Sequence, residues 1–88
     1  TPAEAALMES YEEAGVIGRV LSELREQCTR DDNSIHHLYP MKVIQMLDEW
    51  PEASVRKRQV VKFKKAMQLL DDPEMVKCAQ ALVARISV

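Results

Sequence analysis

Residues 16–28 have the sequence VIGRVLSELREQC, in which apolar side chains recur at the spacing of a single helix face. Ile17, Val20, Leu21, Leu24 and Cys28 stand at positions i, i+3, i+4, i+7 and i+11. This spacing is typical of an amphipathic helix with one face against a core. We therefore predict a helix over residues 16–27.

The segments on either side also carry helix signals. Thr1-Pro2-Ala3-Glu4 combines an N-cap residue, a first-turn proline and a capping-box glutamate, and Gly15 predicts the end of that helix. Asp72-Pro73-Glu74 is a second start signal with an Asp cap and an acid in the first turn. The expected helices cover residues 1–14, 16–27, 40–50, 55–70 and 72–86, with a polar loop over 29–34 and one turn over 36–38.

These helices predict an all-α fold, a compact bundle of four to five short helices. The 88 residues suffice for one domain, so we expect residues 1–88 to be a single helical bundle domain excised from a larger chain. Hydrophobic residues make up 47% of the sequence and aromatic residues only 5%, which argues against a β-sandwich. Trp50 and Phe63 are expected to anchor the core, since aromatic side chains bury the most area.

The cysteine pattern argues against a disulfide-rich protein, and the hydropathy argues against a membrane span. Cys28 and Cys78 are far apart in the sequence and form no CxxC motif, so we predict two small buried hydrophobes of an intracellular protein. A disulfide between them is compatible with the sequence but not required by it. No apolar run approaches the ~18 residues of a membrane span.

Charge is unevenly distributed along the chain, although the net charge is only −2. Residues 1–52 hold eleven acids and four bases, whereas residues 53–88 hold three acids and eight bases. Six of those bases fall within ten positions that contain no acid: Arg56, Lys57, Arg58, Lys62, Lys64 and Lys65. A strongly basic segment in an acidic chain predicts an anionic partner, or otherwise a solvated helix face.

The sequence offers little for catalysis or metal binding. Cys28 with His36 or His37 has the residue types of a nucleophile and a base, but Cys28 continues an apolar stripe. Structural zinc sites take ligands in close CxxC or HxxxH pairs, which are absent here. We therefore predict no enzyme activity, no catalytic residue, no metal and no cofactor.

The second half of the chain resembles the N-terminal domain of transcription elongation factor S-II. Val43-Ile44-Gln45-Met46-Leu47 with Trp50-Pro51 is similar to an apolar helix of that domain and its proline-marked turn. Val60-Val61-Lys62-Phe63-Lys64-Lys65 is similar to its basic helix, and Asp72-Pro73-Glu74-Met75-Val76 to the start of its last helix. The resemblance implies a small right-handed helical bundle that binds short acidic-hydrophobic segments of transcription regulators.

The function expected from the sequence is a non-enzymatic protein-interaction module, with nuclear location favoured over cytoplasmic. Its partner would be a short acidic-hydrophobic peptide that docks on the basic helix by charge steering and an apolar anchor. The expected binding residues are Arg58, Lys62, Phe63, Lys65 and Leu69. Two alternatives remain open: nucleic-acid binding through the basic helix over residues 55–70, and homo-oligomerisation of a helical domain.

Overall fold

The structure is a computed structural model that describes residues 1–30 and 32–86. Its elements follow the order α1 (Pro2–Ala14), β1 (Val16–Val20), the 3-10 turn η1 (Ser22–Leu24), β2 (Glu26–Thr29), β3 (Ile35–Leu38), β4 (Met41–Met46), α2 (Phe63–Leu69) and α3 (Pro73–Ile86). The expected all-α bundle is therefore wrong. The chain is a mixed α/β structure with two antiparallel strand pairs.

The two helices with complete capping signals are confirmed. Thr1 Oγ1 accepts a hydrogen bond from the Glu4 amide at 3.2 Å, and the Glu4 carboxylate accepts from the terminal amine of Thr1. Gly15 ends α1 in the left-handed conformation with φ of 63°. At the start of α3, Asp72 Oδ1 accepts from the Glu74 amide at 2.9 Å. Local capping thus decides where both helices begin.

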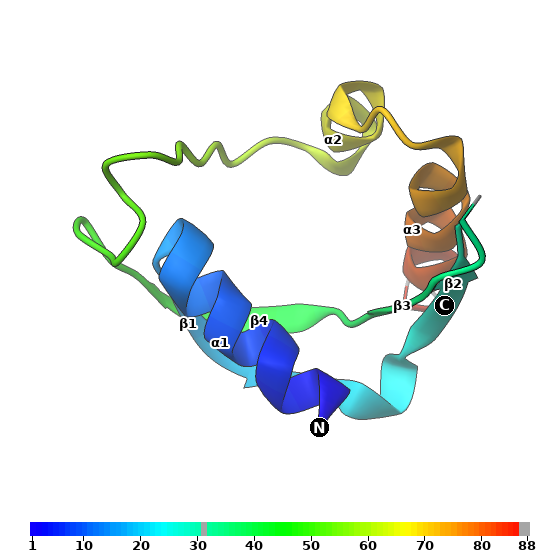
Figure 1. Cartoon of the computed structure of the whole chain (residues 1–88), viewed down its shortest axis with the longest axis horizontal. Coiled ribbons are helices and arrows are strands. Elements are labelled where there is room, and N and C mark those ends of the chain that lie inside the picture. The colour runs from blue at the N-terminus through cyan, green and yellow to red at the C-terminus, as the bar shows by residue number, and fades with distance from the viewer. Residues whose placement is uncertain (31, 87–88) are drawn as a thin grey trace.

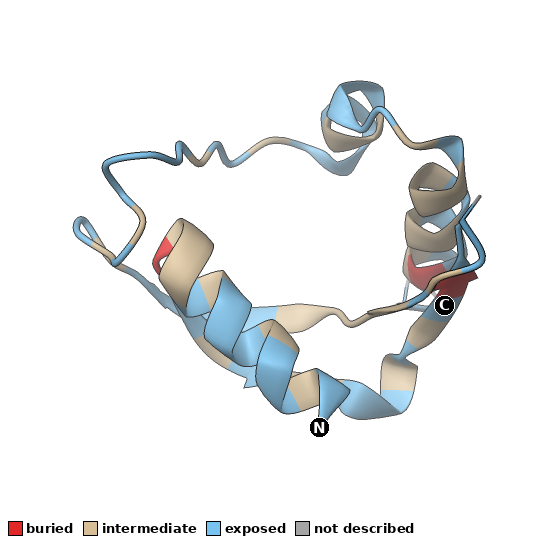
Figure 2. Cartoon of the chain, viewed as in Figure 1, coloured by how far each residue is buried: buried red, intermediate tan, exposed pale blue. Residues whose placement is uncertain are grey.

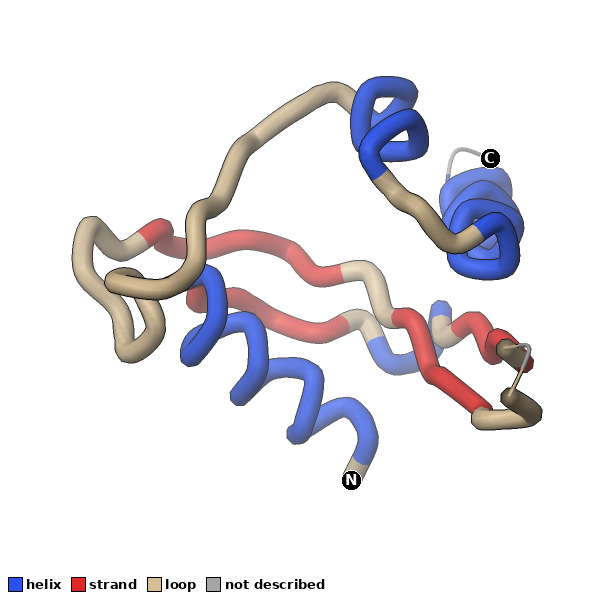
Figure 3. The backbone as a smooth tube through the Cα atoms, turned by 45° about the horizontal axis from the view of Figure 1, so that its top comes forward, coloured by secondary structure: helices blue, strands red, loops and turns tan. Residues whose placement is uncertain are grey.

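The middle of the chain is a β-ribbon where helices were expected over residues 16–27 and 40–50. β1 pairs antiparallel with β4, from Val16 opposite Met46 to Val20 opposite Met41. β2 pairs with β3, which replaces the expected helical turn over 36–38. Figure 3 shows the two pairs following one another along a single bent ribbon, and the Leu21 amide donates to the Pro40 carbonyl at 2.9 Å between them. β-branched residues in both partners fit a pleated strand better than a helix.

Gly18 permits the close approach of the two strands in this ribbon. The β1–β4 register shifts between Ile17 and Gly18, which marks a bulge. A Cβ at Gly18 would collide with the Lys42 carbonyl oxygen and would also press against Met41. Glycine is therefore required here by space, because its missing side chain lets the backbone of β4 pass.

The helices α1 and α3 lie at opposite ends of the β-ribbon (Figure 1). α1 packs along the β1–β4 pair, and α3 packs against the β2–β3 pair (Figure 1). Cys28 of β2 and Cys78 of α3 form a disulfide that joins these two elements. None of the helices in the described part of the chain is long and apolar enough to cross a membrane.

The expected helix over residues 55–70 is reduced to α2, its second half. Residues 56–62 are extended, and they lead from a turn after Trp50 toward α2. Like charges three or four positions apart destabilise a helix, and this segment contains no acid to relieve them. Arg56 and Arg58 instead make hydrogen bonds and ion pairs with distant parts of the chain.

Little of the chain is fully buried, as the scarce red in Figure 2 shows. The buried apolar side chains of the described residues are Cys28, 1% exposed, and Leu82, 7% exposed. Trp50 is only half-buried and Phe63 is 39% exposed, so the core expected around these two aromatics is not formed. The accessible surface of 6614 Å² exceeds the roughly 5,200 Å² of a compact monomer of this mass. The fold is therefore open, with its apolar strands partly exposed.

Replacing Gly18 with alanine is expected to destabilise the protein by about 1–3 kcal/mol, because the strand pair must separate to admit a methyl group. Urea unfolding followed by circular dichroism measures this change. Gln45→Ala on the neighbouring strand is the control, and its exposed side chain predicts a change within about 0.5 kcal/mol. Equal stability of Gly18→Ala and Gln45→Ala would contradict the close approach at Gly18.

Candidate functional site

The C-terminal end of α1 is held by hydrogen bonds from a segment more than thirty residues away. The last carbonyls of a helix have no partner within it and need donors from elsewhere. The Glu12 carbonyl accepts from the Glu52 amide at 3.0 Å, and the Glu13 carbonyl accepts from Trp50 Nε1 at 2.9 Å. We call the hydrogen bonds from residues 47–58 to the carbonyls of residues 12–15 the α1 end cap.

Two further donors complete the α1 end cap. Arg58 Nη1 donates to the Ala14 carbonyl at 2.8 Å and to the Gly15 carbonyl at 3.3 Å. The Leu47 amide also donates to the Gly15 carbonyl, at 2.8 Å. All the carbonyls from residue 12 to residue 15 are thus satisfied by residues 47–58.

The guanidinium of Arg58 is itself fixed in place by an aromatic ring. Its central carbon lies 4.4 Å from the centroid of the Trp50 ring, which is a cation–π contact. A neighbouring arginine contributes a separate interaction: Arg56 pairs with Glu13 at 3.2 Å and with Glu52 at 2.7 Å. These hydrogen bonds and charges hold the pKa of Arg56 above its ordinary value, with the Glu52 bond as the largest cause.

The carboxylates of α1 differ in whether they are engaged. Glu4 belongs to the N-terminal capping box, and Glu13 is paired with Arg56. Glu9 and Glu12 form no ion pair within residues 1–30 and 32–86. They stand at i and i+3 and therefore share one side of the helix, where Glu12 is half-buried and Glu9 exposed. Free carboxylates in this position can accept a proton from a bound water molecule.

A groove of about 450 Å³ lies between α1 and β1, and neither Glu9 nor Glu12 lines it. Its lining is almost entirely apolar, and this volume lies within the range of small-molecule sites. The lining residues are Glu4, Leu7, Met8, Tyr11, Val16, Ile17 and Gly18. The α1 residues of this lining stand at i, i+3, i+4 and i+7, so the groove lies on one face of the helix and Glu9 on another.

A second hollow, of about 520 Å³, lies between the end of α1, the β1–β4 pair and the basic segment. Arg58 lines it together with Ala14 of α1 and Ala66 of α2, so it connects the α1 end cap with α2. The remaining walls are mostly apolar: Val16, Val43, Met46, Gln59, Val60 and Val61.

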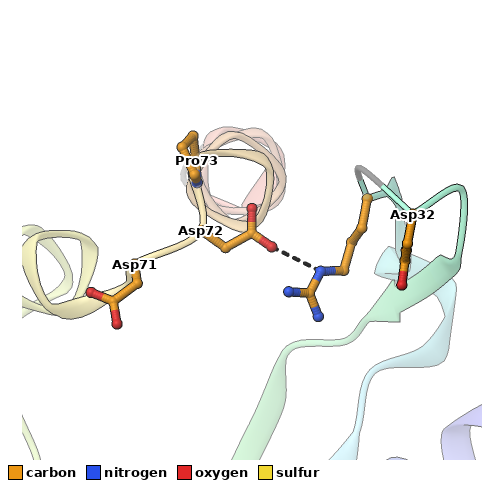
Figure 4. Close-up of a pocket in the computed structure, with 5 residues that line it drawn as sticks. Asp32, Asp71, Asp72 and Pro73 are labelled. Atoms are coloured by element: carbon orange, nitrogen blue, oxygen red, sulfur yellow. Dashed lines mark ion pairs between the residues drawn. The ribbon is translucent and has the colours of Figure 1, made fainter.

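A third, more polar pocket of about 390 Å³ lies at the start of α3 (Figure 4). Arg30 Nε pairs with Asp72 Oδ2 at 2.8 Å, while Asp32 and Asp71 stand on either side of this pair. The single arginine is thus already neutralised by an aspartate that also caps α3. We therefore interpret this pocket as the surroundings of a structural ion pair at the start of α3 and not as a binding site.

The binding residues expected from the sequence lie in different environments. Arg58 is half-buried in the α1 end cap, whereas Lys62 and Lys65 are exposed. Phe63 and Leu69 stand at the two ends of α2, and Leu69 is 54% exposed. The four lysines of this segment form no ion pair within the described ranges: Lys57, Lys62, Lys64 and Lys65. Among these residues, Arg58 is thus hydrogen-bonded to the end of α1, whereas the lysines form no ion pair among the described residues.

The cysteine and histidine candidates do not form a nucleophile–base pair. Cys28 lies opposite His36 in the strand register, but its sulfur is bonded to Cys78. His36 Nε2 lies 3.1 Å from the Ser34 hydroxyl, and His37 Nδ1 is buried without a partner in the described part of the chain. In residues 1–30 and 32–86, no three His, Cys, Asp or Glu side chains are grouped to hold a metal ion.

The carboxylates of α1 are the candidate residues that the sequence analysis missed. Their signal was present, because Glu9, Glu12 and Glu13 stand at i, i+3 and i+4 of a helix with clear capping signals. Such spacing equally describes an ordinary solvated helix face. Only the structure separates the paired Glu13 from the free Glu9 and Glu12.

Comparison with known proteins connects the chain with hydrolases. It is 34% identical over 86 residues to Nudix hydrolase 21, chloroplastic, of Arabidopsis thaliana, a match that covers 93% of this chain and 43% of the relative. It is 34% identical over 89 residues to Nudix hydrolase 18, mitochondrial, of the same plant, covering 97% of this chain and 51% of the relative. Nudix hydrolase 4 shares 33% identity over 84 residues, covering 91% and 41%. The chain thus spans about half the length of the curated relatives that it matches.

No protein-family model and no solved structure matches the chain. The relatives correct the functional expectations drawn from the sequence. They give no indication of a domain like that of elongation factor S-II, and all are named as hydrolases. The expectations of a non-enzymatic transcription scaffold, of peptide docking, of nucleic-acid binding and of a homo-oligomerising helical domain are therefore wrong. The names also give no support for a nuclear location.

Asp32 is expected to titrate below the ordinary range of an aspartate. The Ser34 hydroxyl and the Ser34 amide donate to Asp32 Oδ1 at 2.5 and 2.9 Å, and these bonds lower the pKa of the carboxyl, helped by the charge of Arg30. Because the lowered pKa favours the charged form in the fold, this contribution is present above the unfolded pKa. It is lost as the pH falls through the folded value.

Carboxyl carbon NMR titration tests this prediction. Ser34→Ala removes the larger of the two causes and is expected to raise the pKa of Asp32 toward its ordinary value. Ser22→Ala, which alters an exposed serine outside the hairpin turn, is the control. An Asp32 titration that is the same in Ser34→Ala and the wild type would contradict the role of the hydroxyl.

Proposed function

We propose that this chain is part of a hydrolase related to the Nudix hydrolases. The observation that carries the proposal is the identity of 33–34% with four proteins of that name, which extends over more than nine-tenths of this chain in each case. Similarity spread over the whole chain supports a shared activity more strongly than one short motif would. The proposal concerns the protein to which these residues belong, since the relatives are about twice as long.

In this proposal, the free carboxylates of α1 activate the attacking water. A hydrolase must remove a proton from water as its oxygen attacks, and a carboxylate within hydrogen-bond reach of that water can accept it. Glu12 suits this role better than Glu13, because Glu13 is neutralised by Arg56 at 3.2 Å. Glu9, one turn away on the same side, is the second candidate.

The charge of the basic segment supports an anionic substrate. Lys57, Lys62, Lys64 and Lys65 are exposed and have no acidic partner among the described residues, so their ammonium groups are free to bind anions. Lysine is a frequent phosphate ligand, and a substrate bearing phosphate would be attracted to this side of the second hollow. Lys62, Phe63, Lys65 and Leu69 thus remain proposed binding residues, now for a substrate, whereas the Arg58 guanidinium is engaged with the end of α1.

The relatives named for the chloroplast and the mitochondrion support a location inside the cell. We propose an intracellular site of action on that basis. We further propose that this site of action lies in an organelle, because two of the relatives are named for one.

Hydrolysis is expected when the protein is offered a panel of small anionic molecules with phosphoanhydride, phosphoester and carboxylic ester bonds. Glu12→Gln is expected to lower kcat by about 10²- to 10⁴-fold, which is the usual contribution of a general base. Glu9→Gln tests the second candidate. Release of phosphate or acid, measured by a coupled colorimetric assay, provides the rate.

Glu23→Gln is the matched control, because Glu23 is an exposed glutamate in η1 with no ion pair among the described residues. Its kcat is expected to stay within about twofold of the wild type. No turnover of any substrate class by the wild-type protein would contradict the proposed function. Full activity of both Glu12→Gln and Glu9→Gln would contradict the assignment of α1 as the catalytic element.

A further inference from the structure

We propose that Arg58 is a positioning residue that fixes the last turn of α1 and, through it, the direction of the Glu12 carboxylate. This inference rests on the proposed hydrolase function for its catalytic part. Its structural part is independent, because it concerns only how α1 is held.

The α1 helix lacks the means to satisfy its own C-terminal end. It has no basic residue in its last turn, although the carbonyl end of a helix dipole is stabilised by a nearby cation. Arg58 supplies that cation from 44 residues away in the sequence, and it donates to the Ala14 carbonyl at 2.8 Å. The same nitrogen reaches the Gly15 carbonyl at 3.3 Å, so one guanidinium group spans both the last helical residue and the cap.

Arg58 differs from every other base of the segment in how tightly it is surrounded. Its guanidinium is sandwiched between the helix end and the face of Trp50, whose indole nitrogen donates to the Glu13 carbonyl. Arg56 and Lys57 are both exposed, and Arg56 forms an ion pair with the side chain of Glu13 rather than a bond to a carbonyl of α1. Arg58 and Trp50 thus bind two successive carbonyls of α1 as one stacked unit.

Gly15 makes room for this stacked unit. A Cβ at Gly15 would lie 2.8 Å from Trp50 Cε3 and 2.9 Å from Arg58 Nη1. The position also has φ of 63°, which glycine adopts without strain. Space and conformation both require glycine where the arginine and the tryptophan meet the helix, so the end of α1 has a single arrangement.

Glu12 lies within the turn that this unit fixes. Its backbone carbonyl accepts from the Glu52 amide at 3.0 Å, and the next two carbonyls, those of Glu13 and Ala14, accept from Trp50 Nε1 and Arg58 Nη1. When the backbone of Glu12 is fixed, the direction of its Cα–Cβ bond is fixed as well. Small displacements of a catalytic group reduce the reaction rate strongly. Loss of Arg58 should therefore affect turnover more than substrate affinity.

The test compares Arg58→Met and Arg58→Lys with Arg19→Met as the matched control, because Arg19 is an exposed arginine of β1 with no ion pair among the described residues. Methionine keeps the apolar stem but removes the charge and the donors, whereas lysine keeps the charge and an ammonium donor group but loses the planar guanidinium. Amide hydrogen exchange by NMR measures how well α1 is held, and steady-state kinetics separates kcat from KM. The amides of α3 serve as the internal standard for global stability.

We expect Arg58→Met to accelerate exchange of the amides in the last turn of α1, residues 11–15, at least tenfold, with α3 unchanged within about twofold. Its kcat should fall about tenfold or more at unchanged KM. Arg58→Lys should show both effects to a smaller extent, and Arg19→Met should change neither the exchange rates nor kcat.

Unchanged exchange in α1 of Arg58→Met would overturn the inference whatever the kinetics show. Faster exchange with full kcat would overturn its catalytic part, because the helix end would then not position the reacting group. An inactive wild-type protein would instead contradict the proposed function, and the exchange data would still decide whether Arg58 holds α1.

Discussion

The capture of the last carbonyls of α1 by residues 47–58 is the interaction on which the candidate site depends. Without it, the end of α1 would expose several backbone acceptors beside an aromatic ring and a charged group. The contacts also determine the course of the chain after β4, because Trp50, Glu52 and Arg58 must all return to one helix end. One local need, the satisfaction of helix carbonyls, thus organises a segment without regular structure.

The elements that short-range interactions determine could be predicted from the sequence, whereas the elements that long-range contacts determine could not. α1 and α3 were predicted because their start signals, around Thr1 and Asp72, act within four residues. The strands were missed because Ile17, Val20 and Leu24 fit a helix period, while the decisive partners of β1 lie in β4, more than twenty residues away. The local signs of a strand were the β-branched residues of the segment and Gly18, which disfavours a helix interior.

The candidate site was less predictable than the fold. The sequence correctly marked the basic run as unusual, but it treated all six bases as one face of a helix. The structure divides them, because Arg56 and Arg58 are engaged with α1 whereas the lysines are not. Which base is engaged depends on the position of the α1 end, and that position depends on long-range contacts. The same contacts decide that Glu13 is paired and Glu12 free.

The ion pairs of the structure explain part of the uneven charge distribution along the chain. Arg56 pairs with Glu13 and Arg85 with Glu26, so bases of the second half neutralise acids of the first. Exposed pairs of this kind contribute only about 0–1 kcal/mol each, so their main effect is on which charges remain available. The charges without an ion pair among the described residues include Glu9 and Glu12 of α1 and the lysines near α2. The proposed hydrolase would need free groups of both signs, one to hold an anion and one to activate water, and these residues are the ones proposed for the two roles.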